Sequence, residues 1–204
     1  MKILVFGAAG KTGREVVIQA LSQGHQVTAF LNEQELGKTR KLEHFFGDVL
    51  DADSVLKSMQ AGFDAIVSCL GNNHGNSLVC SGGVKNIISC TYLTGISRLI
   101  CVSSLGLAPE YNSFYFNTVV LPLFIRDVHK DLEKMEKFIT SSNLNWTIVR
   151  PPQLIDKART GNYRVLTQAP ENRLIEIARS DVADFILKEL GNSSFIRQKV
   201  AIGY

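Results

Sequence analysis

The chain opens with a short apolar run that leads directly into three regularly spaced glycines. Residues 2–6 read Lys-Ile-Leu-Val-Phe, and no polar residue alternates through the last four. Such a run is typical of a strand buried on both faces of a parallel sheet. Gly7, Gly10 and Gly13 follow, and an amphipathic segment covers residues 14–20. This order predicts a strand, a tight turn and a helix, and hence an α/β fold.

The glycine spacing also predicts a phosphate-binding turn. Gly7 allows a sharp turn at the strand end, Gly10 leaves room for a pyrophosphate, and Gly13 lets the helix pack closely on the strand. The first N–H groups of the helix and the positive end of its dipole favour an anion. The spacing is G-x-x-G-x-x-G rather than the commoner G-x-G-x-x-G, so a glycine-rich turn without a ligand stays open as the alternative.

Composition narrows the class of protein. The 204 residues suit a single domain, 1–204, and a hydrophobic fraction of 45% fills a sizeable core. A net charge of +3 without a long basic run argues against a nucleic-acid partner. With no apolar run near the ~18 residues of a membrane span and no leader-like segment, we expect a soluble cytoplasmic protein. Four cysteines without metal-ligand spacing predict buried free thiols and no metal site: Cys69, Cys80, Cys90 and Cys101.

Strand-like and helix-like segments alternate along the chain. Apolar runs predict further strands at residues 26–31, 42–46, 64–70, 98–102, 146–149 and 200–202. Helical spacing predicts helices over residues 54–59, 77–95, 127–141 and 182–190. The alternation predicts a doubly wound parallel sheet, Rossmann-like, in one domain with a small C-terminal lobe on the substrate side.

Further predictions concern the N-caps of two helices, a strand pair in the C-terminal half of the chain and the buried face of one helix. Asp51 or Asp53 is placed to cap the helix over residues 54–59, and Ser180-Asp181 to cap the last helix. Residues 161–167 and 173–177 resemble a strand pair. An inward stripe is expected on the helix over residues 77–95, made by Val79, Val84, Ile87, Ile88 and Leu93.

Ligands of open α/β sheets bind beyond the carboxyl ends of the strands. That rule gathers residues from distant parts of the chain around one cleft. They are Gly7 to Gly13, Asn32, Asp48, Gly71, Ser103, Ser104 and the segment 151–153.

Several short motifs together resemble a known family. They are the glycine turn, Gly47-Asp48-Val49, Cys69-Leu70-Gly71, Val102-Ser103-Ser104, the segment 146–152 (Trp-Thr-Ile-Val-Arg-Pro-Pro) and Ser180-Asp181-Val182-Ala183. The chain is similar to the atypical short-chain dehydrogenase/reductase family with an NAD(P)H-binding domain. Within it, the likeness is greatest to the flavin reductase / biliverdin-IX-beta reductase group.

The resemblance implies roles for particular residues. Ser104 matches a serine beside the hydride-transfer site and is the candidate catalytic residue. Residues 105–126 and 151–178 would form the substrate side. The implied cofactor-binding residues are Gly7, Ala9, Gly10, Lys11, Thr12, Gly13, Arg14, Asn32, Asp48, Val49, Leu70, Gly71, Val102, Ser103, Pro151, Pro152 and Gln153.

One departure bears on the chemistry. No tyrosine is followed four residues later by a lysine, so the Tyr-x-x-x-Lys acid/base pair of alcohol-oxidising members is missing. A flavin or a conjugated tetrapyrrole is a good electron sink, so its reduction needs mainly positioning. We therefore expect an NAD(P)H-dependent reductase of FMN, FAD or a linear tetrapyrrole. The alternative is an NAD(P)-binding redox sensor without turnover, and a nucleotide-sugar epimerase or dehydratase is disfavoured.

The sequence leaves open whether NAD or NADP binds, and which residues line the substrate side. Glu33 would suit the ribose of NAD, whereas Lys11, Arg14, Lys38 and Arg40 would neutralise the 2′-phosphate of NADP. We expect NADP, with NAD possible. The aromatic stretch from Tyr111 to Phe124, with Phe114 and Phe116, is interpreted as a lid over a planar acceptor. His129 and Lys130 begin a helix, and either face the cleft or are solvated.

Overall fold

An eight-stranded sheet forms the centre of the computed structural model, which describes residues 1–32, 43–71, 78–108, 126–168 and 174–204. The strand order is β3-β2-β1-β4-β5-β6-β10-β8. The strands are β1 (Lys2–Phe6), β2 (Gln26–Leu31), β3 (Glu43–Phe46), β4 (Ala65–Ser68), β5 (Arg98–Val102), β6 (Asn145–Arg150), β8 (Arg164–Leu166) and β10 (Gln198–Gly203). A separate parallel pair joins β7 (Gln153–Ile155) to β9 (Glu176–Ala178).

The sheet is parallel from β3 through β10, and only the pairing of β10 with the edge strand β8 is antiparallel. Strand β1 lies between β2 and β4, so the chain winds outward from β1 in opposite directions. This reversal is the switch point at which doubly wound sheets bind ligands. The predicted doubly wound, Rossmann-like fold is confirmed.

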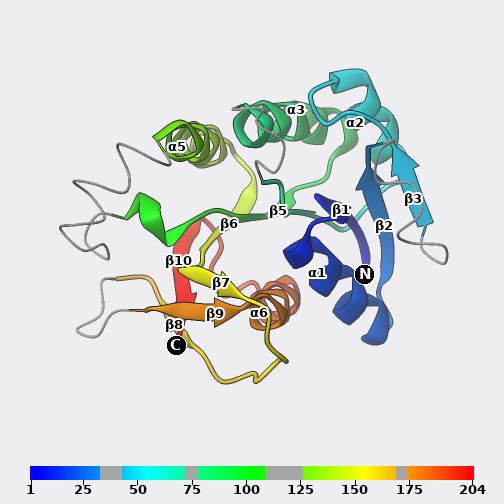
Figure 1. Ribbon diagram of the computed structural model, residues 1–204. Helices are drawn as coiled ribbons and strands as arrows, with labels where there is room; N and C mark the ends of the chain where they lie inside the picture. The colour runs from blue at the N-terminus through cyan, green and yellow to red at the C-terminus, as the bar shows by residue number, and fades with distance from the viewer. Residues whose placement is uncertain (33–42, 72–77, 109–125, 169–173) are drawn as a thin grey trace.

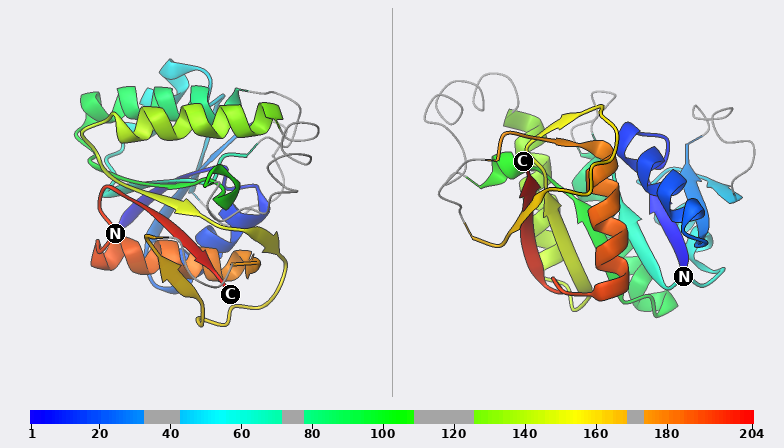
Figure 2. Two further views of the ribbon diagram at one scale, coloured as in Figure 1. Left: turned by 90° about the vertical axis from the view of Figure 1, so that its left-hand side faces the viewer. Right: turned by 90° about the horizontal axis from the view of Figure 1, so that it is seen from below.

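Helices cover both faces of the sheet. One face carries α1 (Lys11–Ser22) and α6 (Arg179–Asn192), and the other carries α2 (Ala52–Met59), α3 (Val79–Thr94) and α5 (Arg126–Thr140). Figure 1 and the left view of Figure 2 show the resulting three layers. Strand β1 is buried on both faces because Ile3 packs toward α1 and α6, and Leu4 packs toward the opposite helices.

Two helix termini follow directly from the sequence. Asp51 caps α2, because its carboxylate accepts hydrogen bonds from the amides of Asp53 and Ser54 at 3.2 Å each. The side-chain hydrogen bond from Ser54 and the amide of Asp53 lower the pKa of Asp51. Helix α3 ends at Gly95, whose φ of +77° suits glycine.

One residue of the expected inward stripe on α3 was placed wrongly. Val84, Ile87 and Ile88 are buried, but Leu93 is 73% exposed. Leu93 follows Ile88 by five residues, which turns it about 140° away on a helix with 3.6 residues per turn. Thr91, three residues after Ile88, is the one that faces inward.

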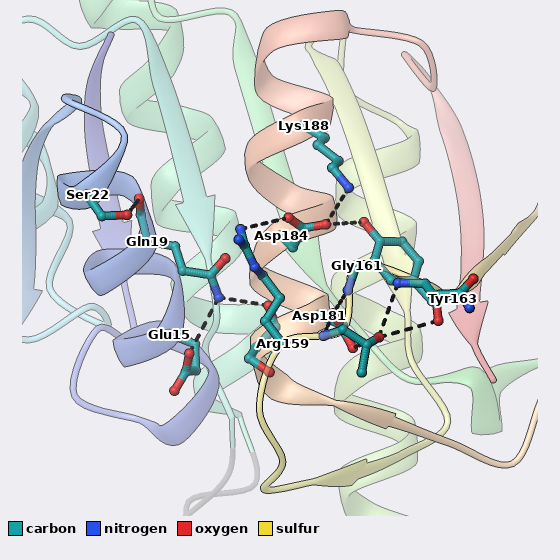
Figure 3. Close-up of polar contacts among 12 residues, drawn as sticks. Glu15, Gln19, Ser22, Arg159, Gly161, Tyr163, Asp181, Asp184 and Lys188 are labelled. Carbon is teal, nitrogen blue, oxygen red and sulfur yellow. Dashed lines mark hydrogen bonds and ion pairs between the residues drawn. The ribbon is translucent and has the colours of Figure 1, made fainter.

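The C-terminal third departs from two expectations. Strands β8 and β9 do not pair with each other, because β8 joins β10 and β9 joins β7. Asp181 does not cap α6, which begins at Arg179. Instead its carboxylate accepts hydrogen bonds from the amides of Thr160 and Gly161, and so holds the segment between β7 and β8 on the helix, as Figure 3 shows.

The four cysteines are free thiols, as the sequence predicts. Cys80, Cys90 and Cys101 are buried, and Cys69 is half-buried at the end of β4. Burial raises the pKa of Cys69 and of Cys101 to about 12 each, so these thiols stay protonated at neutral pH.

A buried ion pair joins α6 to the sheet and yields a stability prediction. The Arg98 guanidinium donates to Glu189 at 2.8 Å, and both side chains are less than a tenth exposed. Glu189→Ala removes the carboxylate that pairs with Arg98, which keeps only backbone carbonyl partners such as Asn145, and should lower the free energy of unfolding by about 3–5 kcal/mol. Urea denaturation measures the loss.

The control is Glu133→Ala, because Glu133 pairs with Lys137 on the surface of α5 and is 54% exposed. This change should cost less than about 1 kcal/mol. Equal losses in the two variants would show that the buried pair does not stabilise the fold.

Candidate functional site

The predicted site residues follow the carboxyl ends of neighbouring parallel strands. The glycine turn follows β1, Asn32 follows β2, and Leu70 and Gly71 lie two and three residues beyond the end of β4. Ser103 follows β5, and Pro151 follows β6. Because these strands are parallel neighbours, the structure brings the predicted residues to one edge of the sheet.

The glycine turn is built by a close approach of backbone to backbone. Gly7 has a φ of +72°, and a Cβ there would lie 2.4 Å from the Cys69 carbonyl oxygen. A Cβ on Gly13 would lie 2.1 Å from the Gly7 carbonyl oxygen, so α1 packs on the turn only with glycine at this position. Gly10 differs, because among the described residues a Cβ would meet only the Gly7 oxygen, at 3.3 Å.

The N-terminus of α1 has the properties of an anion site. No side chain of the described residues caps it, and its first turn carries no acidic residue. Helix α3 is the contrast, because the carboxylate of Asp131 on α5 accepts hydrogen bonds from the amides of Cys80 and Ser81 at 3.0 Å each. The α1 terminus therefore leaves backbone donors and its positive dipole end for a ligand.

Lys11, a predicted cofactor contact, is engaged with a residue that sequence reasoning missed. Its Nζ lies 2.6 Å from Oδ2 of Asp156, whose other oxygen pairs with Arg179. The hydrogen bond from Lys11 and the nearby Arg179 lower the pKa of Asp156. Asp156 follows β7 and Arg179 begins α6, so no motif in the sequence connects them with the glycine turn.

The other predicted cofactor contacts in the glycine turn and after β2, β3 and β4 differ in exposure. Asn32, Arg14 and Gly71 are exposed, and Thr12 and Ala9 are half-buried. Asp48 accepts a hydrogen bond from the Leu50 amide at 2.9 Å. Val49 is buried and packs near Gly83 of α3, and Leu70 is half-buried against the same helix.

Backbone hydrogen bonds join the segments that follow β5 and β6. The Ser103 amide donates to the Val149 carbonyl at 2.7 Å, and the Leu105 amide donates to Pro151 at 2.9 Å. Ser104 caps the short 3-10 helix η2 (Leu105–Leu107), because its Oγ accepts a hydrogen bond from the Gly106 amide at 3.1 Å. Val102, Ser103 and Pro151 are buried, Pro152 and Ser104 are half-buried, and Gln153 is exposed.

A buried carboxylate fixes this pair of strand ends. Glu136 of α5 is 3% exposed and accepts hydrogen bonds from Ser103 Oγ at 2.7 Å and from the Arg150 guanidinium at 2.9 and 2.6 Å. Lys199 adds a third partner at 3.1 Å. Burial raises the pKa of Glu136, but the hydrogen bonds from Arg150 and Ser103 outweigh it, so the pKa is lowered overall. Sequence reasoning missed Glu136 because its partners come from three other segments.

His129 contacts the short helix that follows β5. Its Nε2 lies 3.0 Å from the Gly106 carbonyl oxygen, so the ring joins the first turn of α5 to η2. His129 therefore faces the carboxyl edge rather than solvent. Lys130, next to it, is exposed.

None of the described tyrosines is placed as an acid/base at Ser104. Tyr163 donates to Asp184 and Tyr204 donates to Asp181, both on α6, and the Tyr92 hydroxyl accepts a hydrogen bond from the Asn143 amide. Tyr111 and Tyr115 lie outside the described residues, as do Glu33, Lys38, Arg40, Phe114 and Phe116.

Two classes of site find no support in the described parts of the chain. There, no group of three or more histidine, cysteine or acidic side chains is arranged to hold a metal ion. Across the same residues, no helix has the length and apolarity needed to cross a bilayer. A shallow hollow of about 280 Å³ lies along the second half of α6, lined by Tyr163, Phe185 and Phe195 among others, and it contains none of the predicted site residues.

The sequence of the chain is similar to those of known proteins. The model of the NAD(P)H-binding family matches residues 7–193. An uncharacterized chloroplastic protein of Arabidopsis thaliana is 28% identical over 213 residues, covering 93% of this chain and 71% of the relative.

Solved structures that match this chain along its whole length include a reductase and a short-chain dehydrogenase/reductase. An anaerobillin reductase from Escherichia coli is 26% identical, with a TM-score of 0.82, and the match covers 100% of this chain and 97% of that one. A short-chain dehydrogenase/reductase from Veillonella parvula, solved in complex with NADP, is 16% identical with a TM-score of 0.84, covering 100% and 94%. The second likeness shows the fold alone.

The contact between Gly13 and Gly7 generates a prediction. Gly13→Ala forces α1 away from the turn and should lower the free energy of unfolding by about 1–3 kcal/mol, as overpacking does. Chemical denaturation measures it. Gly10→Ala is the matched control and should cost about 1 kcal/mol or less, because its Cβ would lie 3.3 Å from the Gly7 oxygen, a mildly tight contact that a small shift relieves. A larger loss for Gly10→Ala than for Gly13→Ala would contradict the packing described here.

Glu136 generates a pH prediction. Its pKa in the folded protein is below the ordinary value of 4.5, so its stabilisation is present above that pH and is lost as pH falls through the folded pKa. Glu136→Gln should therefore flatten the rise of unfolding free energy with pH below about pH 4.5. Denaturation at a series of pH values tests this, and an unchanged slope would show that Glu136 is not the titrating group.

Proposed function

Because the chain belongs to the NAD(P)H-binding family, we propose that it is a reductase that transfers hydride from NADPH to a flavin or a similar planar conjugated acceptor. The observation that supports it most is the uncapped N-terminus of α1 beyond the glycine turn. A diphosphate is the anion that such a terminus suits, and the room at Gly10 allows its close approach.

The cofactor fits the residues at this edge. The amides at the start of α1 would hold the diphosphate, Asp48 and Val49 would frame the adenine, and Val102 and Ser103 would lie beside the nicotinamide. When bound, the reduced nicotinamide supplies the hydride. The chain's own contribution is to hold Ser103 and Pro151 in place through Glu136 and the hydrogen bonds between the β5 and β6 ends.

Ser104 is the residue we assign to the acceptor. Its Oγ already accepts a hydrogen bond from the Gly106 amide, so its hydroxyl proton is left to donate to a carbonyl or ring nitrogen of the acceptor. Of the described tyrosines, Tyr163 and Tyr204 donate to carboxylates of α6 rather than toward Ser104. The missing Tyr-x-x-x-Lys pair favours an acceptor that needs no tyrosine acid. The likeness to an anaerobillin reductase is consistent with a planar acceptor.

The direct test mixes the purified protein with NADPH and, in turn, FMN, FAD and a linear tetrapyrrole, and follows the loss of nicotinamide absorbance. We expect turnover with at least one of them. Binding of NADPH without oxidation by any acceptor would favour the alternative, a redox sensor that signals through a partner.

Ser104→Ala should lower kcat for the acceptor about tenfold and leave the Kd for NADPH unchanged, because the serine contacts the acceptor rather than the diphosphate. Steady-state kinetics with a parallel binding titration measures both. An unchanged kcat would remove Ser104 from the reaction.

A further inference from the structure

We propose that Asp156 competes with the bound dinucleotide for Lys11 and thereby limits the affinity of the protein for its cofactor. The inference rests on the proposed function, because it assumes that a diphosphate lies at the start of α1. It assigns a role to a residue outside every motif in the sequence.

The geometry places an acid beside the phosphate-binding turn. Lys11 is the first residue of α1 and lies between Gly10 and Gly13. Its Nζ is 2.6 Å from Oδ2 of Asp156, a residue 145 positions later in the chain. Asp156 directly follows β7, whose first residue is the predicted cofactor contact Gln153. The Asp156 carboxylate, which belongs to the segment predicted to form the substrate side, therefore neutralises Lys11, the cation within the glycine turn.

The exposure of the two side chains makes this ion pair easy to exchange. The Lys11 side chain is 70% exposed and that of Asp156 is 58% exposed, so water screens their attraction. A diphosphate offers Lys11 more negative charge and more acceptor oxygens than one carboxylate. When the cofactor binds, Lys11 is expected to turn from Asp156 to the phosphate.

Asp156 stays in place when Lys11 leaves. Its other oxygen pairs with Arg179, whose side chain is only 20% exposed at the start of α6. Figure 3 shows the neighbouring anchors, in which Asp181 and Asp184 of α6 hold Gly161, Tyr163 and Arg159 of the following segment. Arg179 therefore keeps the Asp156 carboxylate within reach of Lys11 while the cofactor is bound.

A limit on affinity has a use in a reductase. The oxidised cofactor leaves after every hydride transfer, and release of product often sets kcat. If Asp156 pairs again with Lys11 as the diphosphate leaves, this ion pair favours release of the oxidised cofactor.

The test is the Kd of NADP for the Asp156→Asn variant, by isothermal titration calorimetry at low ionic strength. We expect the Kd to fall about threefold or more, and the gain to shrink in high salt because the effect is electrostatic. Glu176→Gln is the matched control, because Glu176 pairs with Lys157 at 3.0 Å and belongs to β9, the partner strand of β7. It removes the same charge and should leave the Kd unchanged.

Two results would overturn the inference. One is an Asp156→Asn variant that binds NADP no more tightly than the unaltered protein. The other is an equal gain when Lys11→Gln is already present, because Asp156 would then act without Lys11. Failure of the unaltered protein to bind NADP or NAD is a separate result, and it would contradict the proposed function itself.

Discussion

The contact between the start of α1 and the end of β1 determines where a ligand can bind. Gly13 packs so closely on the Gly7 carbonyl that no side chain fits between them. This contact fixes the axis of α1 and directs its N-terminal amides toward the carboxyl edge of the sheet. Gly7 adds a left-handed turn against Cys69 at the end of β4, so β1, β4 and α1 meet at one point.

Helix α5 organises the other half of the edge through buried polar side chains. Asp131 caps α3, Glu136 holds the ends of β5 and β6, and His129 contacts η2. Glu136 and Asp131 are each 3% exposed, so these carboxylates keep their geometry by full hydrogen bonding rather than by solvation. Buried hydrogen bonds thus fix the ends of β5 and β6, where we propose that the nicotinamide binds. The Lys11 contact with Asp156 at the start of α1, in contrast, is exposed.

Patterns local in sequence predicted the fold well, and contacts between distant segments were the part that could not be predicted. Apolar runs located the parallel strands of the main sheet, and the glycine spacing located the turn, whereas β7 was not predicted. Leu93 was misplaced because one apolar residue at the end of a helix does not define a face, and the pairing of β8 and β9 was wrong because register depends on partners elsewhere. Asp156, Arg179 and Glu136 were missed for the same reason, since each acquires its role from residues far along the chain.

The account depends on the amides at the start of α1 binding a dinucleotide diphosphate. Titration of isotope-labelled protein with NADP, followed by backbone amide chemical shifts in NMR spectra, examines those groups directly. The account predicts the largest shifts at Gly10, Lys11, Thr12 and Gly13. Unchanged shifts at these four amides would contradict it, as would the largest changes appearing instead at Tyr163, Phe185 and Phe195, beside the hollow along α6.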